Sequence, residues 1–204
     1  MNVLSQKNDK NIQKVIIEFT YYEDDFKYSL LNGIHKENEI QFINEDTKER
    51  NYLAGDKIEI QWKYEKVSAF GDENSVFYAK KIISSKKIKN GYVTKFRKSY
   101  TKEMRFHWID ENYSDQYLDK IYLNVERYVA KSKDKLIKAI VKNNENLLYS
   151  IEQQIYLEKE YTFIGIGIEN ENHFNVFQWL YFDSESNILY EYDLATDQLI
   201  KFSY

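Results

Sequence analysis

Apolar and polar residues alternate along most of the first hundred residues, which is the pattern of half-buried β-strands. Residues 15–22 and 57–64 show it most clearly, with Ile58, Ile60 and Trp62 on one face of the second segment. The predicted strands of this half span residues 15–22, 26–31, 39–44, 57–64 and 75–84. Asn32-Gly33 is a hairpin signal, and Asn90-Gly91 predicts a further hairpin over residues 86–97.

The spacing of apolar residues changes to three and four in the middle of the chain. Ser114 is placed to cap a helix that continues to about Val129. Ser132 is placed to cap a second helix, which Asn143-Asn144 would end. Leu147, Leu148, Ile151 and Ile155 predict a third helix.

Alternation returns after residue 160 and predicts four strands, over residues 161–168, 174–183, 188–193 and 199–202. Gly165 and Gly167 fall on the same face of the first of these strands. Because glycine leaves the backbone bare, this predicts that another element or a ligand packs closely there.

Together these elements predict an α+β protein. Residues 1–98 would form an N-terminal antiparallel small β-barrel or sheet. Residues 99–204 would form an α+β unit, in which two to three helices pack on a C-terminal β-meander of three to four strands.

The N-terminal half carries a recurring sequence of strand and turn signals. They are Asn32-Gly33, Glu39–Asn44, Gly55-Asp56, Ile58–Trp62 and Phe77–Ile83. On this pattern, about 70 residues resemble a small barrel of the SH3 or OB type. An OB-fold usually has a helix between its third and fourth strands, whereas only a short connection over Glu65–Asn74 is found here. The difference favours an SH3-like barrel or a plain meander.

Composition narrows the functional classes. The 204 residues include no Cys, which excludes disulfides, cysteine metal sites and thiol nucleophiles. The first residues lack the apolar segment of a signal peptide, and no apolar run approaches the roughly 18 residues of a membrane span. We therefore expect a soluble, cytoplasmic protein without membrane association, and the bias toward Lys, Asn, Ile and Tyr indicates a bacterial source.

The net charge of −4 conceals one basic segment. Residues 80–105 carry 10 basic residues and a single acid, Glu103, between two acidic flanks. Lysines among aromatic side chains can follow phosphates while the rings stack on bases, so the segment predicts a nucleic-acid site. Its candidate residues are Lys80, Lys81, Lys87, Lys89, Tyr92, Lys95, Phe96 and Arg97. The alternative is a solvated segment that pairs with the acids of its own chain.

The C-terminal strands carry acids beside aromatic residues. Small bacterial immunity proteins that inhibit nucleases use such faces, because opposite charge speeds association and Tyr and Trp are favoured interface anchors. The candidate partner-binding residues are Trp179, Tyr181, Asp183, Glu185, Tyr190, Glu191, Tyr192 and Asp193. The alternative is the ordinary outer face of a meander.

Motifs for catalysis or metal binding are lacking in the sequence. His35, His107 and His173 are widely separated, and no nucleophile elbow or phosphate-binding loop occurs. The nearest local grouping is His107 with Asp110, which the alternative reading places in an aromatic linker. We predict no cofactor, no metal and no catalytic residue. Binding of a protein partner ranks first, binding of nucleic acid second, and an enzyme assembled only in space last.

Overall fold

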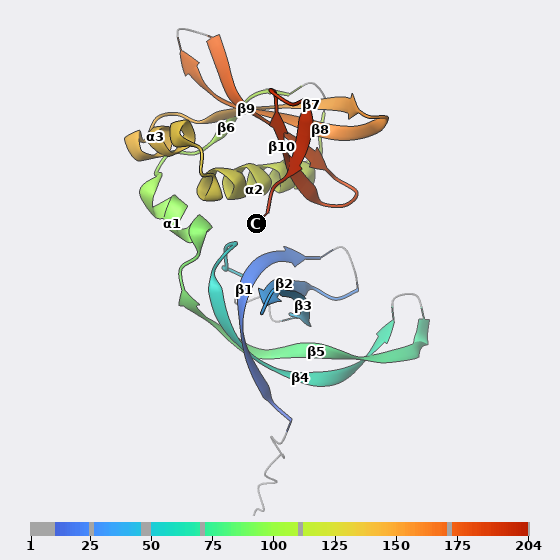
Figure 1. The fold of residues 1–204 in the computed structure, drawn as a ribbon. Helices are drawn as coiled ribbons and strands as arrows, with labels where there is room; N and C mark the ends of the chain where they lie inside the picture. The colour runs from blue at the N-terminus through green and yellow to red at the C-terminus, as the bar shows by residue number, and fades with distance from the viewer. Residues whose placement is uncertain are drawn as a thin grey trace, which may run out of the picture. The chain divides into compact units, whose positions relative to one another are not determined.

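The computed structural model describes residues 11–24, 27–45, 50–69, 72–109, 112–170 and 173–203. The chain forms two compact units, residues 1–95 and 96–204, and it passes from one to the other inside helix α1 (Figure 1). The elements of the first unit are β1 (Gln13–Glu23), β2 (Leu30–His35), β3 (Asn38–Ile43), β4 (Lys57–Ala69), β5 (Asp72–Lys89) and the start of α1 (Tyr92–Ser99). The elements of the second unit are β6 (Arg105–Ile109), α2 (Asp115–Lys131), α3 (Lys135–Asn143), β7 (Leu148–Tyr156), β8 (Lys159–Asn170), β9 (His173–Asp183), β10 (Ile188–Asp193) and β11 (Gln198–Lys201).

The first unit is a closed barrel with the strand order β1-β2-β3-β5-β4. β3 and β5 pair in parallel at Ile43 and Lys81, and the other neighbours are antiparallel. A five-stranded barrel in this order is the OB topology. The predicted small β-barrel is therefore confirmed. The strand order, rather than a helix between β3 and β4, decides its type, so the OB alternative is correct and the preference for an SH3-like barrel or a meander was wrong.

The barrel core follows the predicted alternation. Ile58 and Ile60 of β4 are fully buried, and Trp62 is 6% exposed. They pack against the inward residues of β1, β2 and β3, which are Ile17, Phe19, Leu31 and Phe42. Burial of these apolar side chains is the main stabilising contribution to the unit.

One predicted hairpin forms between β2 and β3 with its turn at a different position, and the other is wrong. Glycine explains both differences. Asn32-Gly33 lies inside β2, and the turn is formed by Lys36 and Glu37, both with positive φ. A Cβ on Gly33 would lie 2.4 Å from Ile17 Cδ1, so the glycine serves close packing instead of a turn.

At the second site, β5 continues to Lys89 and is followed by α1, where a hairpin was predicted. Gly91 separates the two elements, since a Cβ there would lie 2.0 Å from the carbonyl carbon of Gly55. The tight approach fixes the point at which the strand gives way to the helix.

The second unit is a six-stranded sheet in the order β11-β10-β9-β8-β7-β6. The predicted meander is confirmed, and β6 extends it by pairing in parallel with β7. Ser114 caps α2 as predicted, by accepting a hydrogen bond from Tyr117 N. The N-cap of α3 is Asp134, because Ser132 instead ends α2, and Asn144 ends α3 in the left-handed conformation.

The third helix predicted over residues 147–155 is wrong, because this segment is strand β7. Its buried residues Leu147, Tyr149 and Ile151 recur at a spacing of two, which the helical reading overlooked. α1 is the third helix of the protein. Residues 105–109, interpreted as part of a linker, are the edge strand β6.

Helices and sheet of the second unit share one core. Ile121, Val125 and Tyr128 of α2 pack against the sheet residues Ile151 and Ile164. Over the described residues, no helix is long and apolar enough to cross a membrane.

Candidate nucleic-acid interface

A groove of about 200 Å³ lies on the barrel, where β2 and β3 meet the loop before β2 and the β4–β5 hairpin. In OB-folds this face and these two loops are the usual place for binding oligonucleotides. The residues that line the groove are Lys27, Tyr28, Leu30, Gln41, Phe42, Ile43, Ser68, Phe77, Ala79 and Lys80.

Hydrogen bonds join the two loops beside the groove. Lys27 Nζ donates to Ser68 Oγ at 2.6 Å, and the Tyr28 hydroxyl donates to the Ser68 carbonyl at 3.2 Å. Asn44 N donates to the Ser29 carbonyl at 2.8 Å, which fixes the same loop to the end of β3. The groove is thereby formed before any ligand binds, which lowers the cost of ordering it.

The lining combines rings with positive charge. Phe77 is 49% exposed, and its neighbour Tyr78 is 71% exposed. Lys27 and Lys80 are both cations, and no acid lines the groove among the residues that the structure describes. The groove can therefore offer a stacking surface and two charges to an anionic chain.

Trp62 lies under this surface. The Lys80 ammonium is 5.9 Å from the centre of its indole, and Phe42 and Tyr64 contact it edge-on. The indole N–H is buried and has no acceptor among the described residues. Lys80 is thus held over an aromatic face by a cation–π contact.

Most of the other predicted nucleic-acid residues are engaged by the chain itself. Lys81 forms salt bridges with Glu45 at 2.8 Å and Glu65 at 2.9 Å, and these bonds raise its pKa. Arg97 is paired with Glu126, and Phe96 is buried in the core of the second unit. Lys89 and Lys95 are exposed, while Tyr92 is half-buried against Gly55. Lys80 alone of the eight predicted residues lines the groove.

Lys87 belongs to a buried hydrogen-bond network around Asp56, whose side chain is fully buried. The carboxylate accepts from Thr94 Oγ1 at 2.6 Å, Gly91 N at 2.7 Å, Leu53 N at 3.0 Å and Lys87 Nζ at 3.1 Å. Burial opposes ionisation, but the four donors prevail and lower the pKa of Asp56. This network anchors the start of α1 to the barrel.

The aromatic residues of the C-terminal sheet form a layer on the face opposite α2. Phe163 and Trp179 stack at 4.3 Å, and Tyr181 contacts Phe163. The other rings of the layer are Tyr156, Tyr161, Tyr190 and Tyr192. A Cβ on Gly165 would lie 2.6 Å from Trp179, so the ring of Trp179 on the neighbouring strand packs against the bare backbone. The two glycines predicted close packing of another element or a ligand, and at Gly165 it is another element.

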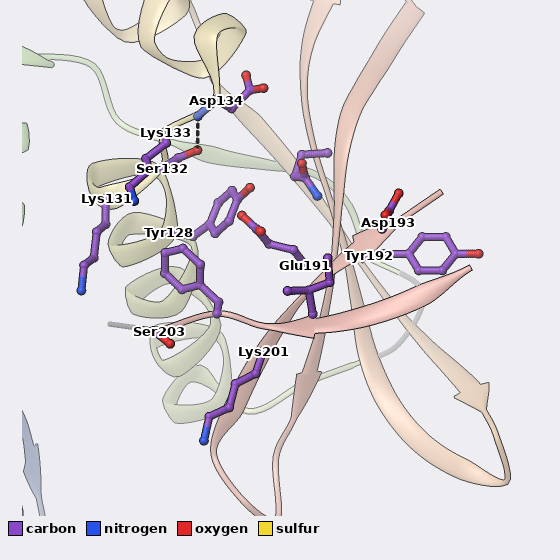
Figure 2. A pocket seen from close by; sticks show the side chains of 13 residues that line it. Tyr128, Lys131, Ser132, Lys133, Asp134, Glu191, Tyr192, Asp193, Lys201 and Ser203 are labelled. Carbon is purple, nitrogen blue, oxygen red and sulfur yellow. Dashed lines mark hydrogen bonds between the residues drawn. The ribbon is translucent and has the colours of Figure 1, made fainter. Parts of the chain in front are cut away.

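Alternation along β10 separates the predicted partner-binding acids from these rings. Glu191 faces Tyr128 of α2, whereas Tyr192 points away from both (Figure 2). Burial raises the pKa of Tyr128, and so do the negative charge of Glu191 and the hydrogen bond to its carboxylate. Asp193 accepts from Ala195 N at 2.9 Å and Thr196 Oγ1 at 2.8 Å, and therefore serves the β10–β11 turn.

Asp183 is the last residue of β9, and Glu185 lies in the turn that leads to β10. Asp183 is 3% exposed and accepts from Lys159 Nζ at 2.6 Å, from the Ser186 hydroxyl and from backbone N–H groups. Burial works against ionisation, but these donors lower the pKa of Asp183 to about 2. Glu185 is 86% exposed. The acids and rings predicted to form one surface are therefore divided between two faces and a turn.

The histidines singled out in the sequence are the candidates for metal binding and catalysis in the part of the chain that the structure describes. No group of three or more His, Cys, Asp or Glu side chains there could hold a metal ion. The His107 ring stacks on Phe174 at 4.7 Å, and Asp110 lies outside the described residues.

Sequence reasoning missed Lys27, Tyr28 and Phe77. The first two follow an acidic turn and the third lies in an alternating strand, so their own neighbourhoods gave no signal. Recognising the OB order of strands would have pointed to them, because it brings the loop before β2 and the β4–β5 hairpin together.

No family model and no curated protein matches the sequence. Among solved structures, the chain is similar to an aspartyl tRNA synthetase from Entamoeba histolytica, with 10% identity and a TM-score of 0.29. The match covers 79% of this chain and 48% of that one, so the chain spans about half the length of that protein.

Proposed function

We propose that the protein binds single-stranded nucleic acid in the groove of its barrel. The observation that carries the proposal is the groove lining, in which the half-exposed ring of Phe77 lies with two lysines and, among the described residues, no acid. Bases would stack on Phe77 and Tyr28, and Lys27 and Lys80 would contact phosphates. Tyr64 and Tyr78 are two further exposed rings on the β4–β5 hairpin.

The experiment is a binding titration of the full chain with a fluorescently labelled single-stranded 12-mer of deoxythymidine or uridine. Replacing one stacking ring should weaken binding about tenfold, so we expect that effect for Phe77→Ala. Ile88→Ala, a half-exposed residue of the same strand, is the matched control and should leave binding unchanged.

Adjacent lysines provide a sharper test of the charge. Lys80→Gln should lower the slope of log K against log salt by about 0.7, because one phosphate contact is lost. Lys81→Gln removes a charge from the next residue, which Glu45 and Glu65 already neutralise, and should change the slope little. Absence of binding at low salt, or equal effects of the two lysines, would contradict the proposal.

Binding of a protein partner through the C-terminal sheet is a second candidate, because Trp179 and the tyrosines beside it form one continuous aromatic layer. Glu185 would supply exposed negative charge at the edge of that layer. An immunity-like role predicts that the protein blocks a toxin encoded by the neighbouring reading frame. Glu185→Lys should then slow association, and an unchanged rate would argue against this surface.

A further inference from the structure

A second cavity, of about 800 Å³, lies within residues 96–204. It is bounded by the second turn of α1, the segment that follows it, α2 and Tyr149 of β7. Rings contribute much of its wall. They are Phe96, Tyr100, Phe106, Tyr122 and Tyr149. Phe96 and Tyr100 stack on each other at 5.2 Å, whereas Phe106 is 50% exposed and available to a ligand.

A buried ion pair lines this cavity. Glu126, only 1% exposed, accepts from Arg97 Nε at 2.6 Å and from Arg97 Nη2 at 2.9 Å. Burying a carboxylate is costly, and an ion pair often compensates for this no better than well-packed apolar side chains would. The pair does fix the guanidinium in one orientation. Arg97 is 44% exposed, and its Nη1 is not used by the carboxylate.

Further donors line the same cavity. Lys102 and Arg105 contribute cations, and Tyr122 and Tyr149 contribute hydroxyl groups. A tyrosine hydroxyl is protonated at neutral pH and able to donate. Burial raises the pKa of both tyrosines further, that of Tyr149 to about 12. The donors and the rings therefore converge on one space.

The acids that line the cavity differ in whether a cation of the cavity neutralises them. Glu126 is neutralised by Arg97, and Glu103 lies 3.8 Å from Arg105 with both side chains largely exposed. Asp119, which is exposed on α2, also lines the cavity. An anion would therefore avoid the Asp119 side and settle toward Arg97 and Arg105.

We propose that this cavity binds a small organic anion that carries a flat ring. The ring would lie against Phe106, and the anionic group would be bound by Arg97 with the help of Arg105. Nucleoside monophosphates and aromatic carboxylates share this chemistry, since both combine a ring with an oxyanion that fits the fork of a guanidinium.

The experiment is isothermal titration of the full chain with adenosine monophosphate, 4-hydroxybenzoate, adenosine and inorganic phosphate. At least one of the two ring anions should bind saturably and more tightly than adenosine or phosphate. Which of the two binds identifies the source of the anion. The proposal would be overturned if neither ring anion bound saturably, or if inorganic phosphate bound as tightly as the ring anions do.

Variants locate the site. Arg97→Met alone would leave Glu126 buried without its partner. The double variant Arg97→Met/Glu126→Leu replaces the ion pair by two apolar side chains, so the variant protein should still fold. It should weaken binding of the ring anion about tenfold, and Arg105→Gln, at an exposed position, about threefold. Lys98→Gln, an exposed cation of α1 outside the cavity, is the charge-matched control and should have no effect.

Two more variants sharpen the assignment. Asp119→Asn removes the repelling acid and should strengthen binding about twofold to threefold. Phe77→Ala alters the barrel groove and should leave this binding unchanged, so the two proposed sites fail or succeed separately. Binding that is indifferent to both the Arg97 double variant and Arg105→Gln would show that the ligand lies elsewhere and would refute the assignment.

Discussion

The barrel groove and the aromatic layer of the C-terminal sheet contain similar residues and use them differently. In the groove, Phe77 is half exposed and Lys80 has no acid beside it among the lining residues. In the sheet layer the rings cover one another, and Phe163 and Tyr181 are 8% and 5% exposed. Two hydroxyls of the layer are also engaged, since Tyr192 donates to Asp197 at 2.7 Å and Tyr156 donates to the Asp197 carbonyl at 2.8 Å.

The difference teaches that an aromatic or basic residue is available to a ligand only through the part of its side chain that its own chain has not already bound. Lys80 and Lys81 make the point most simply. They are adjacent in sequence, but one contacts a ring at the groove and the other bridges two carboxylates. Substitutions can therefore distinguish side chains that stabilise the fold from side chains that remain open to a ligand.

The largest effect is expected at Asp56, the most fully engaged acid of the barrel. Asp56→Ala would leave two N–H groups, a hydroxyl and an ammonium without their acceptor, which should destabilise the protein by about 4 kcal/mol. Asp56→Asn retains one acceptor oxygen and should cost less. Urea unfolding measures both, and a loss below about 1 kcal/mol for the alanine variant would show that the network is not structural.

The next prediction compares one ring from each surface. Trp179→Ala removes a ring that stacks on Phe163 and covers Gly165, and should destabilise the protein by about 3 kcal/mol. Phe77→Ala removes a ring that is half exposed, and should cost less than about 1 kcal/mol while it weakens oligonucleotide binding. Equal losses of stability in the two variants would abolish the distinction between the surfaces.

A smaller effect is expected from the pH dependence of Asp183. Its pKa of about 2 lies below the ordinary value of 3.8, so its ionised form stabilises the fold above about pH 4. That contribution, about 2 kcal/mol, should disappear as the pH falls from about 4 to 2.

The matched variant is Asp183→Asn, which lacks the titrating group. Urea midpoints recorded from about pH 6 downward should show the stability difference between wild type and variant shrinking as Asp183 becomes protonated. A difference that stays constant across this range would show that the turn does not depend on the charge.

Local signals predicted much of the fold. The strands of the meander, the Ser114 cap and the alternation of Ile58, Ile60 and Trp62 depend on neighbours in sequence, and all were confirmed. Gly33 and Gly91 misled, because their role is contact with distant residues and not a turn.

The site was harder to predict than the fold. The groove joins a loop near residue 27 to a hairpin near residue 77, and no local pattern links them. The basic segment was evident from its composition. Whether each of its cations is neutralised depends on acids far away in the sequence, as the pairing of Arg97 with Glu126 shows. Pairing of this kind is decided by the tertiary fold and leaves no trace in the spacing of residues.

The indole of Trp62 gives the protein an optical reporter of its own. Its N–H is buried with no acceptor among the described residues, so it lacks the polar surroundings that shift tryptophan emission to longer wavelengths. Lys80 and Phe42, which both line the groove, contact that ring. A bound nucleic-acid strand that draws Lys80 toward a phosphate would remove a positive charge from the indole face and change the emission of Trp62. Occupancy of the groove should therefore be readable from unlabelled protein, and Trp62→Phe would identify the source of the signal.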